Sequence, residues 1–318
     1  MANILVTARS FAKLEQTKIM FEAAGHRVLL SPFDRPLNED ELAELIVDAD
    51  ALVAGMDDIT EKVFAAAVSR LKIIARHGVG YDNIDLLAAK KYNIPVTITP
   101  SGPTKATAEL TMALILSVAR NVPQMDKAIR SGSWSRMTGH EVAGKTLGII
   151  GLGRIGCEVA KRPQAFEMKV MAYDFYPNVK LAEQYGIPFV SFEEMLAQAD
   201  FISLHVPATK ETNGLMNKQA FDKMKATAYL INASRGSVVV EKDLCEALKN
   251  GIIAGAGLDA FEQEPLGQSP LLELSNVVLT PHIGGNTKES TIRMAIAAAE
   301  EVIRVLAGEP PKDPVVLR

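Results

Sequence analysis

The stretch GKTLGIIGLGRIG, residues 144–156, decides the fold of this chain. Its apolar run predicts a strand over Thr146–Ile150, and the glycines that follow have the spacing G-x-G-x-x-G and lead into a helical segment. Gly151 permits a tight turn, Gly153 lets the backbone approach a pyrophosphate, and Gly156 allows the helix to pack closely on the strand. This stretch therefore predicts a nucleotide-binding βα unit.

The residues after the glycines sharpen this prediction. Arg154 and Ile155 lie at the start of the helix, where free N–H groups attract an anion. About 20 residues further on, where such sites place an acid, the predicted strand Lys169–Tyr173 ends at Asp174. A carboxylate there can accept hydrogen bonds from both ribose hydroxyls, and it repels a 2′-phosphate. The combination favours NAD over NADP, the alternative being a tight turn followed by an exposed aspartate.

Apolar β-rich segments alternate with amphipathic segments on both sides of this motif. The first series predicts five strands, Ile4–Thr7, Arg27–Leu30, Ala51–Ala54, Lys72–Arg76 and Val96–Ile98. Crossover helices such as Phe11–Ala24 and Asn38–Val47 lie between them. The second series predicts seven, Thr146–Ile150, Lys169–Tyr173, Phe189–Val190, Phe201–Leu204, Tyr229–Asn232, Gly255–Leu258 and Val277–Leu279. This alternation is typical of parallel sheets covered by helices on both faces.

Two series predict an α/β fold with two doubly wound, Rossmann-like or flavodoxin-like domains and an active-site cleft between them. Residues 1–100 and 288–318, which include the final helix Lys288–Ala307, are expected to form the substrate domain. Residues 101–287 are expected to form the NAD-binding domain. A long helix over Lys105–Arg120 and an exposed arm over 131–144 belong to the second domain, and a capping box at Ser191–Glu194 opens one of its later helices.

Composition excludes several classes of protein. Hydrophobic residues make up 48% and charged residues 23% of 318, and the net charge is −4, so neither disorder nor attraction to nucleic acid is expected. No apolar run approaches the roughly 20 residues of a membrane span, and the N-terminus does not resemble a signal peptide. The two cysteines, Cys157 and Cys245, form no metal or disulfide pattern. We expect a cytoplasmic protein with no metal and with a small-molecule partner.

Hydride chemistry at a hydroxyl carbon needs a group that exchanges the hydroxyl proton, and histidine is suited to this near neutral pH. Of the five histidines, His26 and His140 are expected at the surface. His77 and His205 lie at strand ends and could line a cleft. His282 follows a strand at its carboxyl end, where open α/β sheets place their ligands.

Two further residues at strand ends complete a set. Glu264 follows the strand Gly255–Leu258 and could orient the imidazole of His282 and favour its protonated form. Arg235 follows the strand Tyr229–Asn232, and its two-pronged guanidinium suits the carboxylate of a 2-hydroxy or 2-keto acid. Singly, each could be an ordinary capping partner, solvated acid or surface ion pair.

At this point the chain resembles the D-specific 2-hydroxyacid dehydrogenases, which include 3-phosphoglycerate dehydrogenases and glyoxylate/hydroxypyruvate reductases. The resemblance runs nearly end to end. It rests on the glycine motif with Asp174 and on four further stretches: Leu204-His205-Val206-Pro207 with Thr212, Ile231-Asn232-Ala233-Ser234-Arg235-Gly236, Gly257-Leu258-Asp259-Ala260-Phe261 through Glu264-Pro265, and Thr280-Pro281-His282-Ile283-Gly284. It implies an NAD-dependent oxidoreductase acting on a CH–OH group, in a short form without an appended regulatory domain.

The resemblance also implies roles for single residues. Arg235, Glu264 and His282 would be catalytic, with Arg235 on the substrate carboxylate and Glu264 supporting His282. Asp259 would contact the nicotinamide side of the cofactor. Further cofactor contacts would come from Val206, Pro207, Thr212, Ala233 and Gly284. The stretch Arg76–Asp85 resembles the family's substrate loop, whose backbone amides, at Gly78, Val79 and Gly80, would face the substrate carboxylate.

Three questions stay open on these residues. The substrate could be of the 3-phosphoglycerate, glycerate/hydroxypyruvate or glyoxylate type, and Arg76 and Lys105 could reach a phosphate or simply be solvated. A co-repressor that senses NAD(H) on the same fold is the alternative function, and a methyltransferase is a more distant one. We expect a homodimer, formed by the helix Lys105–Arg120 and the arm 131–141.

Overall fold

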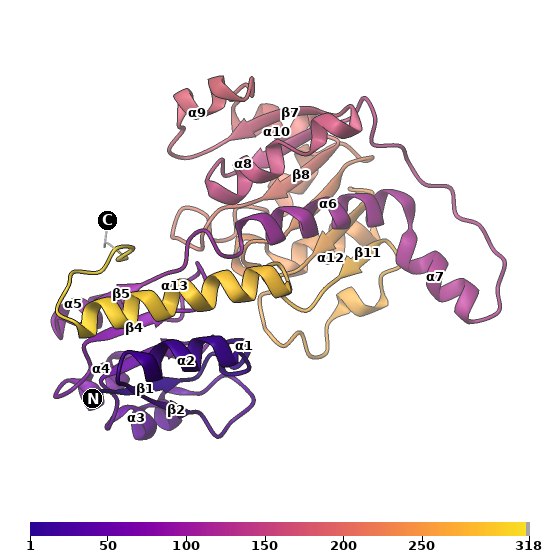
Figure 1. Cartoon of the computed structure of the whole chain (residues 1–318). Helices are drawn as coiled ribbons and strands as arrows, with labels where there is room; N and C mark the ends of the chain where they lie inside the picture. Colours follow the sequence, from indigo (N-terminus) through magenta and orange to yellow (C-terminus); the bar gives the residue numbers. More distant parts are fainter. Residues whose placement is uncertain (316–318) are drawn as a thin grey trace. The chain divides into compact units, whose positions relative to one another are not determined.

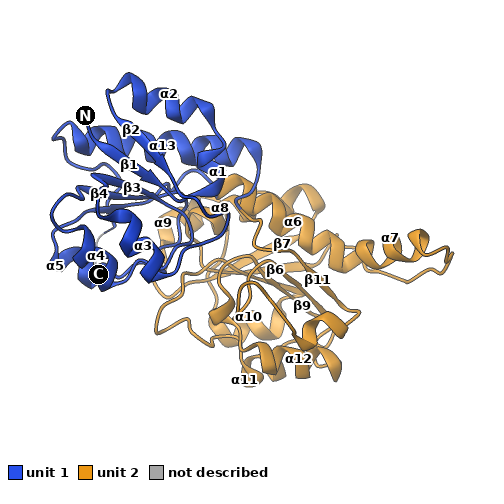
Figure 2. Cartoon of the chain, turned by 90° about the horizontal axis from the view of Figure 1, so that it is seen from below, with its two compact units in different colours: residues 1–103, 285–318 blue, residues 104–284 orange. Residues whose placement is uncertain are grey.

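A computed structural model describes residues 1–315 of the chain, which divides into two compact units (Figure 2). Unit 1 comprises Met1–Pro103 and Gly285–Arg318, and unit 2 comprises Thr104–Gly284. Each unit has its own parallel sheet with helices on both faces (Figure 1), which confirms the predicted α/β fold class.

Unit 1 contains a five-stranded sheet in the order β2-β1-β3-β4-β5, and every pairing is parallel. The strands are β1 (Asn3–Val6), β2 (Arg27–Leu30), β3 (Ala51–Ala54), β4 (Ile73–Arg76) and β5 (Val96–Thr97). The central strands β3 and β4 are buried along their whole length, as expected when helices cover both faces. All five lie where the sequence predicted them, with ends that differ by one residue at most.

Helices cover the two faces of this sheet in sets of three. On one face α1 (Arg9–Ala12), α2 (Glu15–Ala23) and α13 (Lys288–Leu306) pack on the side chains of Ile4 and Val6. On the other, α3 (Glu39–Ile46), α4 (Glu61–Ala67) and α5 (Leu86–Lys91) pack on Leu5 and its neighbours. The alternation of side chains along each strand therefore separates two apolar cores.

One helix of unit 1 differs from the prediction. A single helix over Phe11–Ala24 was expected, but the chain forms α1 and α2 with a break between them. Leu14 adopts an extended conformation at the break, with φ −100° and ψ 103°, and its side chain packs against the core. Burial of Leu14 therefore competes successfully with the continuation of the helix.

Unit 2 contains a six-stranded parallel sheet in the order β11-β10-β9-β8-β6-β7. The strands are β6 (Thr146–Ile150), β7 (Lys169–Tyr173), β8 (Phe201–Leu204), β9 (Tyr229–Asn232), β10 (Gly255–Leu258) and β11 (Val277–Leu279). The strand predicted at Phe189–Val190 is wrong, because Phe189 forms only an isolated bridge with Ala172 beside the edge strand β7. The order reverses between β6 and β8, which creates a switch point at their carboxyl ends.

The helices of unit 2 likewise lie on two faces. On one face α6 (Thr104–Arg120) and α8 (Arg154–Ala160) pack on β6 and β9. On the other lie α10 (Phe192–Gln198), α11 (Lys218–Lys223) and α12 (Glu241–Lys249). The remaining α-helices are α9 (Val179–Gln184) and α7 (Val122–Arg130), and short 3₁₀ turns occupy Pro163–Phe166, Gly236–Val238 and Pro270–Glu273. At the predicted capping box, the Ser191 side chain caps α10 by accepting a hydrogen bond from Glu194 N.

The helix α7 was not predicted. It has no buried residue, and it extends away from the sheet of its own unit (Figure 2). The apolar side chains of α6, by contrast, are mostly buried within unit 2 against β9, β10 and α8. Exposed apolar surface in this region therefore belongs to α7 and to the segment 131–141.

No helix within residues 1–315 is both long enough and apolar enough to cross a bilayer.

Candidate active site

The glycine-rich turn between β6 and α8 has the geometry of a dinucleotide cradle. Gly151 has a φ of 95°, in the region that favours glycine, and a β-carbon on it would lie 2.6 Å from the carbonyl oxygen of His205. A β-carbon on Gly156 would lie 2.1 Å from the Gly151 carbonyl oxygen, so α8 packs directly on the turn. Gly153 has no atom within 4 Å of the place of its β-carbon. The turn is closed on the protein side and open at Gly153.

The residues at the start of α8 border this open side. Arg154 is exposed and Ile155 is half-buried. Their backbone N–H groups belong to the first turn of the helix, where no intrahelical acceptor exists. The turn can therefore receive a pyrophosphate on its backbone.

Asp174 follows β7 and braces this turn. Its Oδ2 accepts a hydrogen bond from Leu152 N at 2.8 Å, and its Oδ1 accepts one from Tyr176 N at 2.9 Å. Each carboxylate oxygen can accept a further hydrogen bond. Asp174 is thus positioned beside the glycines with capacity left for two ribose hydroxyls.

Other residues that the resemblance assigned to the cofactor lie after β8 and β9 in the same unit. Val206 is buried, Pro207 is exposed and Ala233 is half-buried. The Thr212 hydroxyl donates to the Pro207 carbonyl oxygen at 2.6 Å and is itself buried. Thr212 therefore holds the shape of the loop after β8.

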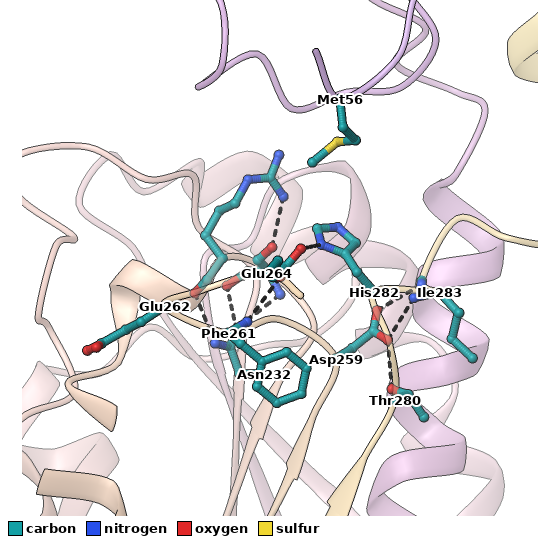
Figure 3. Close-up of polar contacts among 12 residues, drawn as sticks. Met56, Asn232, Asp259, Phe261, Glu262, Glu264, Thr280, His282 and Ile283 are labelled. Carbon is teal, nitrogen blue, oxygen red and sulfur yellow. Dashed lines mark hydrogen bonds and ion pairs between the residues drawn. The ribbon is translucent and has the colours of Figure 1, made fainter. Parts of the chain in front are cut away.

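Asp259 anchors the turn that carries His282 (Figure 3). Its carboxylate is 2% exposed and accepts hydrogen bonds from Ile283 N and Gly284 N, both at 2.8 Å, and from the Thr280 hydroxyl at 2.6 Å. A β-carbon on Gly284 would lie 3.1 Å from Asp259 Oδ2. In the structure the Asp259 carboxylate holds this turn, and its contact with the cofactor, which the resemblance implies, stays a prediction.

The backbone of His282 is unusual. Its φ is 51°, in the left-handed region that few residues other than glycine adopt. The three hydrogen bonds to Asp259 hold the turn in that conformation. Such conformations persist only where the surroundings fix them, and they are concentrated at functional sites.

Glu264 and His282 form a close pair in Figure 3. His282 Nδ1 lies 2.7 Å from Glu264 Oε2, and the side chains are 34% and 31% exposed. Glu264 Oε1 accepts a hydrogen bond from Phe261 N at 3.0 Å. His282 Nε2 has no hydrogen-bond partner within residues 1–315 and is free to meet a substrate. A carboxylate on Nδ1 fixes the tautomer and favours the imidazolium form.

The environment of Glu264 keeps it ionised. Partial burial acts to raise the pKa of the Glu264 carboxyl, but the hydrogen bond and charge of His282, the N–H of Phe261 and the charge of Arg235 outweigh it. The net effect lowers the pKa of Glu264 below its usual value. The pair therefore presents a carboxylate to the imidazole across the neutral range.

Arg235 follows β9 in a loop that is fixed by hydrogen bonds with Asn232, the last residue of the strand. Asn232 Nδ2 donates to the Arg235 carbonyl oxygen at 2.9 Å, and Ser234 donates its N–H and its hydroxyl to Asn232 Oδ1. Arg235 Nη1 donates to the Ser234 carbonyl oxygen at 2.8 Å. The guanidinium is half-buried, and its charge reaches Glu264.

Gly236 links this loop to the loop of Glu264. A β-carbon on Gly236 would lie 1.8 Å from the carbonyl carbon of Phe261 and 2.4 Å from Glu262 N. Any side chain at 236 would therefore displace the peptide between Phe261 and Glu262. Glycine is required because two backbones meet here.

The predicted substrate loop of unit 1 follows β4. Gly78 N donates to Thr99 Oγ1 at 2.9 Å, so this amide already has a partner in the protein. Within residues 1–315 the amides of Val79 and Gly80 donate to no acceptor. Of the three amides predicted to face the substrate, those of Val79 and Gly80 therefore have no partner in the protein within residues 1–315, and that of Gly78 has one.

Arg76 lies inside this loop and is 7% exposed. Its Nε donates to the Gly80 carbonyl oxygen at 2.9 Å, its Nη1 donates to the His77 carbonyl oxygen, and its Nη2 contacts Met56 Sδ at 2.9 Å. A β-carbon on Gly78 would lie 2.9 Å from Arg76 Nη1. The guanidinium is therefore engaged with its own loop, although the sequence left it open as a phosphate contact.

The remaining histidines lie in other surroundings. Burial lowers the pKa of His77 to about 4, its Nε2 lies 3.4 Å from the Thr291 carbonyl oxygen, and its ring stands edge-on to Phe11. Burial lowers the pKa of His205 to about 3, and its Nε2 shares a hydrogen with Ser203 Oγ at 2.8 Å. His140 is exposed as expected, but His26 is half-buried rather than fully at the surface.

Residues 1–315 contain no group of three or more His, Cys, Asp or Glu side chains able to hold a metal ion.

Comparison with known proteins now assigns the family. Residues 112–284 match the sequence model of the D-isomer specific 2-hydroxyacid dehydrogenase, NAD binding domain. The chain belongs to this family. Unit 2, with its glycine turn and Asp174, is accordingly the family's NAD-binding domain, and its cofactor is NAD.

Two relatives illustrate the range of the family. A glyoxylate reductase of Korarchaeum cryptofilum is 44% identical over 286 residues, which are 87% of this chain and 86% of that protein. A D-3-phosphoglycerate dehydrogenase of Archaeoglobus fulgidus is 43% identical over 284 residues, 88% of this chain. This chain spans only 54% of the length of the second relative.

A solved structure agrees with the fold. The TT0316 protein from Thermus thermophilus superposes with a TM-score of 0.89 and 39% identity, covering 99% of this chain and 100% of the other. The two proteins therefore share the same fold over nearly all of this chain.

Sequence reasoning missed several residues that shape this site. Thr280 and Phe261 fix the loops of His282 and Glu264 through hydrogen bonds with Asp259 and Glu264. Thr280 lies within a motif quoted from the sequence, but its hydroxyl contact could not be read from spacing. The contact of Gly236 with Phe261 joins residues far apart in the chain, so no local pattern reveals it.

Proposed function

We propose that this protein is an NAD-dependent D-2-hydroxyacid dehydrogenase that interconverts a small 2-hydroxy acid and its 2-keto acid. The observation that carries the proposal is the Glu264–His282 contact of 2.7 Å, on a turn that Asp259 fixes within the NAD-binding unit. The names of the relatives support substrates of the glyoxylate or 3-phosphoglycerate type, and hydroxypyruvate is chemically close to both.

His282 exchanges the proton in this proposal. In reduction the imidazolium donates from Nε2 to the oxygen that develops negative charge at C2, and in oxidation the neutral imidazole removes the hydroxyl proton. Glu264 accepts the hydrogen bond from Nδ1–H and stabilises the imidazolium, which is the donor in reduction and is formed in oxidation. Reduction and oxidation therefore require opposite protonation states of His282.

Arg235 and the loop of unit 1 bind the substrate in this proposal. The Arg235 guanidinium is suited to hold the carboxylate in a two-pronged contact. The amides of Val79 and Gly80 are proposed as further donors to the substrate. A carboxylate held in two prongs by Arg235 fixes which face of C2 is presented, so that a single enantiomer reacts.

The NAD-binding unit holds the cofactor through groups described above. The open backbone at Gly153 and the first turn of α8 receive the pyrophosphate, and Asp174 receives the adenosine ribose. The bound nicotinamide supplies the hydride that reduces C2. We propose that Val206, Pro207, Ala233 and Gly284 line the same site, with Thr212 and Asp259 as supports.

The test is a panel of 2-keto acids with NADH. Glyoxylate, hydroxypyruvate, pyruvate and 3-phosphohydroxypyruvate are each mixed with enzyme and NADH, and the loss of NADH absorbance is followed. We expect turnover with at least one of them and its disappearance in His282→Ala. Tight NADH binding without turnover on any member would contradict the proposal and favour an NAD(H)-sensing protein instead.

We also propose that the protein is a homodimer formed through α7 and the segment 131–141. Val122, Ile129 and Trp134 are 53%, 54% and 78% exposed, more apolar surface than a monomer needs here. A groove of about 650 Å³ between α6 and α7 is lined by Leu116, Arg120, Val122, Met125, Asp126 and Ile129. A monomeric mass by light scattering at micromolar concentration would refute this.

We further propose a cytoplasmic location. Cys157 and Cys245 are both free thiols, which is the usual state in a reducing compartment. Fractionation of cells that express a tagged chain would test the location, and recovery of the protein outside the cytoplasmic fraction would contradict it.

A further inference from the structure

Two glutamates next to the catalytic loop hold each other's backbone. Glu241, the first residue of α12, donates its N–H to Glu262 Oε1 at 2.9 Å, and Glu262 donates its N–H to Glu241 Oε1 at 2.5 Å. Glu262 belongs to the loop after β10 that carries Glu264. The reciprocal pair therefore ties this loop to the start of a core helix.

The tie lies close to the catalytic carboxylate along the chain. Phe261, the neighbour of Glu262, is buried and donates its N–H to Glu264 Oε1 at 3.0 Å. The peptide between Phe261 and Glu262 also rests on Gly236. Two successive backbone N–H groups are therefore involved. That of Phe261 donates to Glu264, and that of Glu262 donates to Glu241.

We propose that Glu241 and Glu262 are positioning residues that keep the Glu264 carboxylate on His282. The inference rests on the proposed function only for its consequence in catalysis, since the hydrogen bonds exist independently of any substrate. Without the tie the loop gains freedom, and the Glu264 carboxylate spends less time on the imidazole. The proton donor is then both less well oriented and less readily protonated.

Other charged groups surround the tie between Glu241 and Glu262. Burial and then the charges of Glu262 and Glu264 raise the pKa of Glu241, so these carboxylates sense one another. Arg235 and His282 are the positive groups that face Glu264, and Cys245 on α12 faces Glu241 and Glu262. A glutamine at 262 keeps an oxygen that accepts from Glu241 N but removes the charge, so it separates hydrogen bonding from electrostatics.

The test compares Glu262→Ala, Glu241→Ala and Glu262→Gln with Glu246→Ala, which removes an exposed acid from the same helix. We expect each of the first two to lower kcat for keto-acid reduction by about 10-fold, because a poorly oriented general acid loses part of its contribution. Glu262→Gln should stay within about 3-fold of the parent, because the acceptor oxygen is retained. Glu246→Ala should match the parent.

The pH dependence gives a readout that a purely structural role would not move. The pH above which keto-acid reduction declines should move toward acid in Glu262→Ala, because a less well placed Glu264 carboxylate stabilises the imidazolium less. Glu264→Gln removes that charge altogether and should move this limb of the pH profile further in the same direction. An NMR titration of the His282 imidazole, assigned with a His282→Asn sample, should show the same shift without any substrate. NADH affinity should stay within about 2-fold in all variants, because no cofactor group is touched.

Several results would overturn the inference. The first is a pH profile of reduction and a His282 titration that match the parent in both Glu262→Ala and Glu241→Ala. The second is a fall in kcat in Glu262→Gln as large as that in Glu262→Ala. The third is a fall in kcat in Glu246→Ala equal to that in the two alanine variants. If Glu262→Ala fails to fold, Glu241→Ala removes only the acceptor of Glu262 N and carries the same test. If the parent enzyme reduces no keto acid, the proposed function fails, while the His282 titration still decides the inference.

Discussion

The carboxyl edges of the two sheets are built alike but use their polar residues differently. In unit 1 the fully buried Asp57 accepts hydrogen bonds from the Thr7 hydroxyl and from Leu37 N and Gly55 N, the last two at 3.0 Å. Arg76 is likewise engaged with its own loop. In unit 2 the side chains of Glu264 and His282 are about a third exposed. Glu264 contacts only Nδ1 of the imidazole, so Nε2 is not engaged by this pair.

This difference separates two tasks. At the edge of unit 1 the buried charges of Asp57 and Arg76 are hydrogen-bonded within the protein, while the amides of Val79 and Gly80 donate to no acceptor within residues 1–315. The edge of unit 2 presents side chains that ionise. Changes in unit 1 should therefore alter substrate affinity and stability, whereas changes in unit 2 should alter chemistry and pH dependence.

The largest effect is expected for His282→Ala. Loss of the general acid should lower kcat by about 10³-fold or more in the keto-acid direction. NADH affinity, measured by fluorescence titration, should change little, and His140→Ala provides a control at an exposed histidine. If His282→Ala keeps near-normal turnover, the proton donor lies elsewhere.

Arg235→Lys tests the substrate clamp of unit 2. A point charge in place of a two-pronged contact should raise KM for the keto acid roughly 30-fold, with a smaller change in kcat. Steady-state kinetics and an NADH titration separate the two ligands. An equal loss of NADH affinity would show that Arg235 serves the cofactor.

Asp174→Ala tests the cofactor choice. The parent should prefer NAD over NADP, and removal of the carboxylate should narrow the ratio of kcat/KM by about 10-fold, since like-charge repulsion of a 2′-phosphate disappears. The variant also loses the acceptor of Leu152 N, so NAD affinity should fall as well. A parent enzyme that prefers NADPH would show the assignment to be wrong.

Arg76→Lys tests the loop of unit 1. Lysine cannot replace the guanidinium contacts that hold this loop, so the loop should bind substrate less well. KM should rise about 5-fold, and equally for phosphorylated and unphosphorylated keto acids. Arg70→Lys is the matched control, because Arg70 pairs with Asp50 at the opposite edge of the same sheet. A rise confined to the phosphorylated substrate would identify Arg76 as a phosphate contact.

His77→Phe should have the smallest effect, on stability alone. Burial depresses the pKa of His77 from 6.5 to about 4, so the unfolded chain binds a proton first as pH falls. The stability that this histidine contributes is present above pH 6.5 and is lost between there and pH 4. Between pH 7 and 5 the parent should lose about 2 kcal/mol more than the variant. Thermal scans at both values check this, and parallel losses would contradict it.

Much of the fold could be predicted because most of its strands are buried on both faces. Segments such as Tyr229–Asn232 and Gly255–Leu258 are short apolar runs between polar turns, and they form strands with those bounds. The helix α7 escaped prediction because none of its residues enters a core. The break at Leu14 escaped because it depends on tertiary packing rather than on local pattern.

The site was only partly predictable. The sequence places Glu264, His282 and Arg235 at strand ends, and parallel strands bring such residues to one edge. The contacts that fix them were hidden, because Asp259 with Ile283 N and Glu241 with Glu262 join loops distant in the chain. The hydrogen bond from Gly78 N to Thr99 Oγ1 likewise joins two separate loops, so the sequence did not reveal that this amide has a partner.

The contact between Gly236 and the peptide after Phe261 has a consequence for engineering. Loop 233–238 and loop 259–265 meet at Gly236, where there is no room for a β-carbon, so an exchange of either loop must preserve this contact. A chimera that imports the second loop from a relative should require glycine at 236 and a matching backbone there. Libraries that vary loop 259–265 while glycine is kept at 236 should yield more folded members than libraries that also vary position 236.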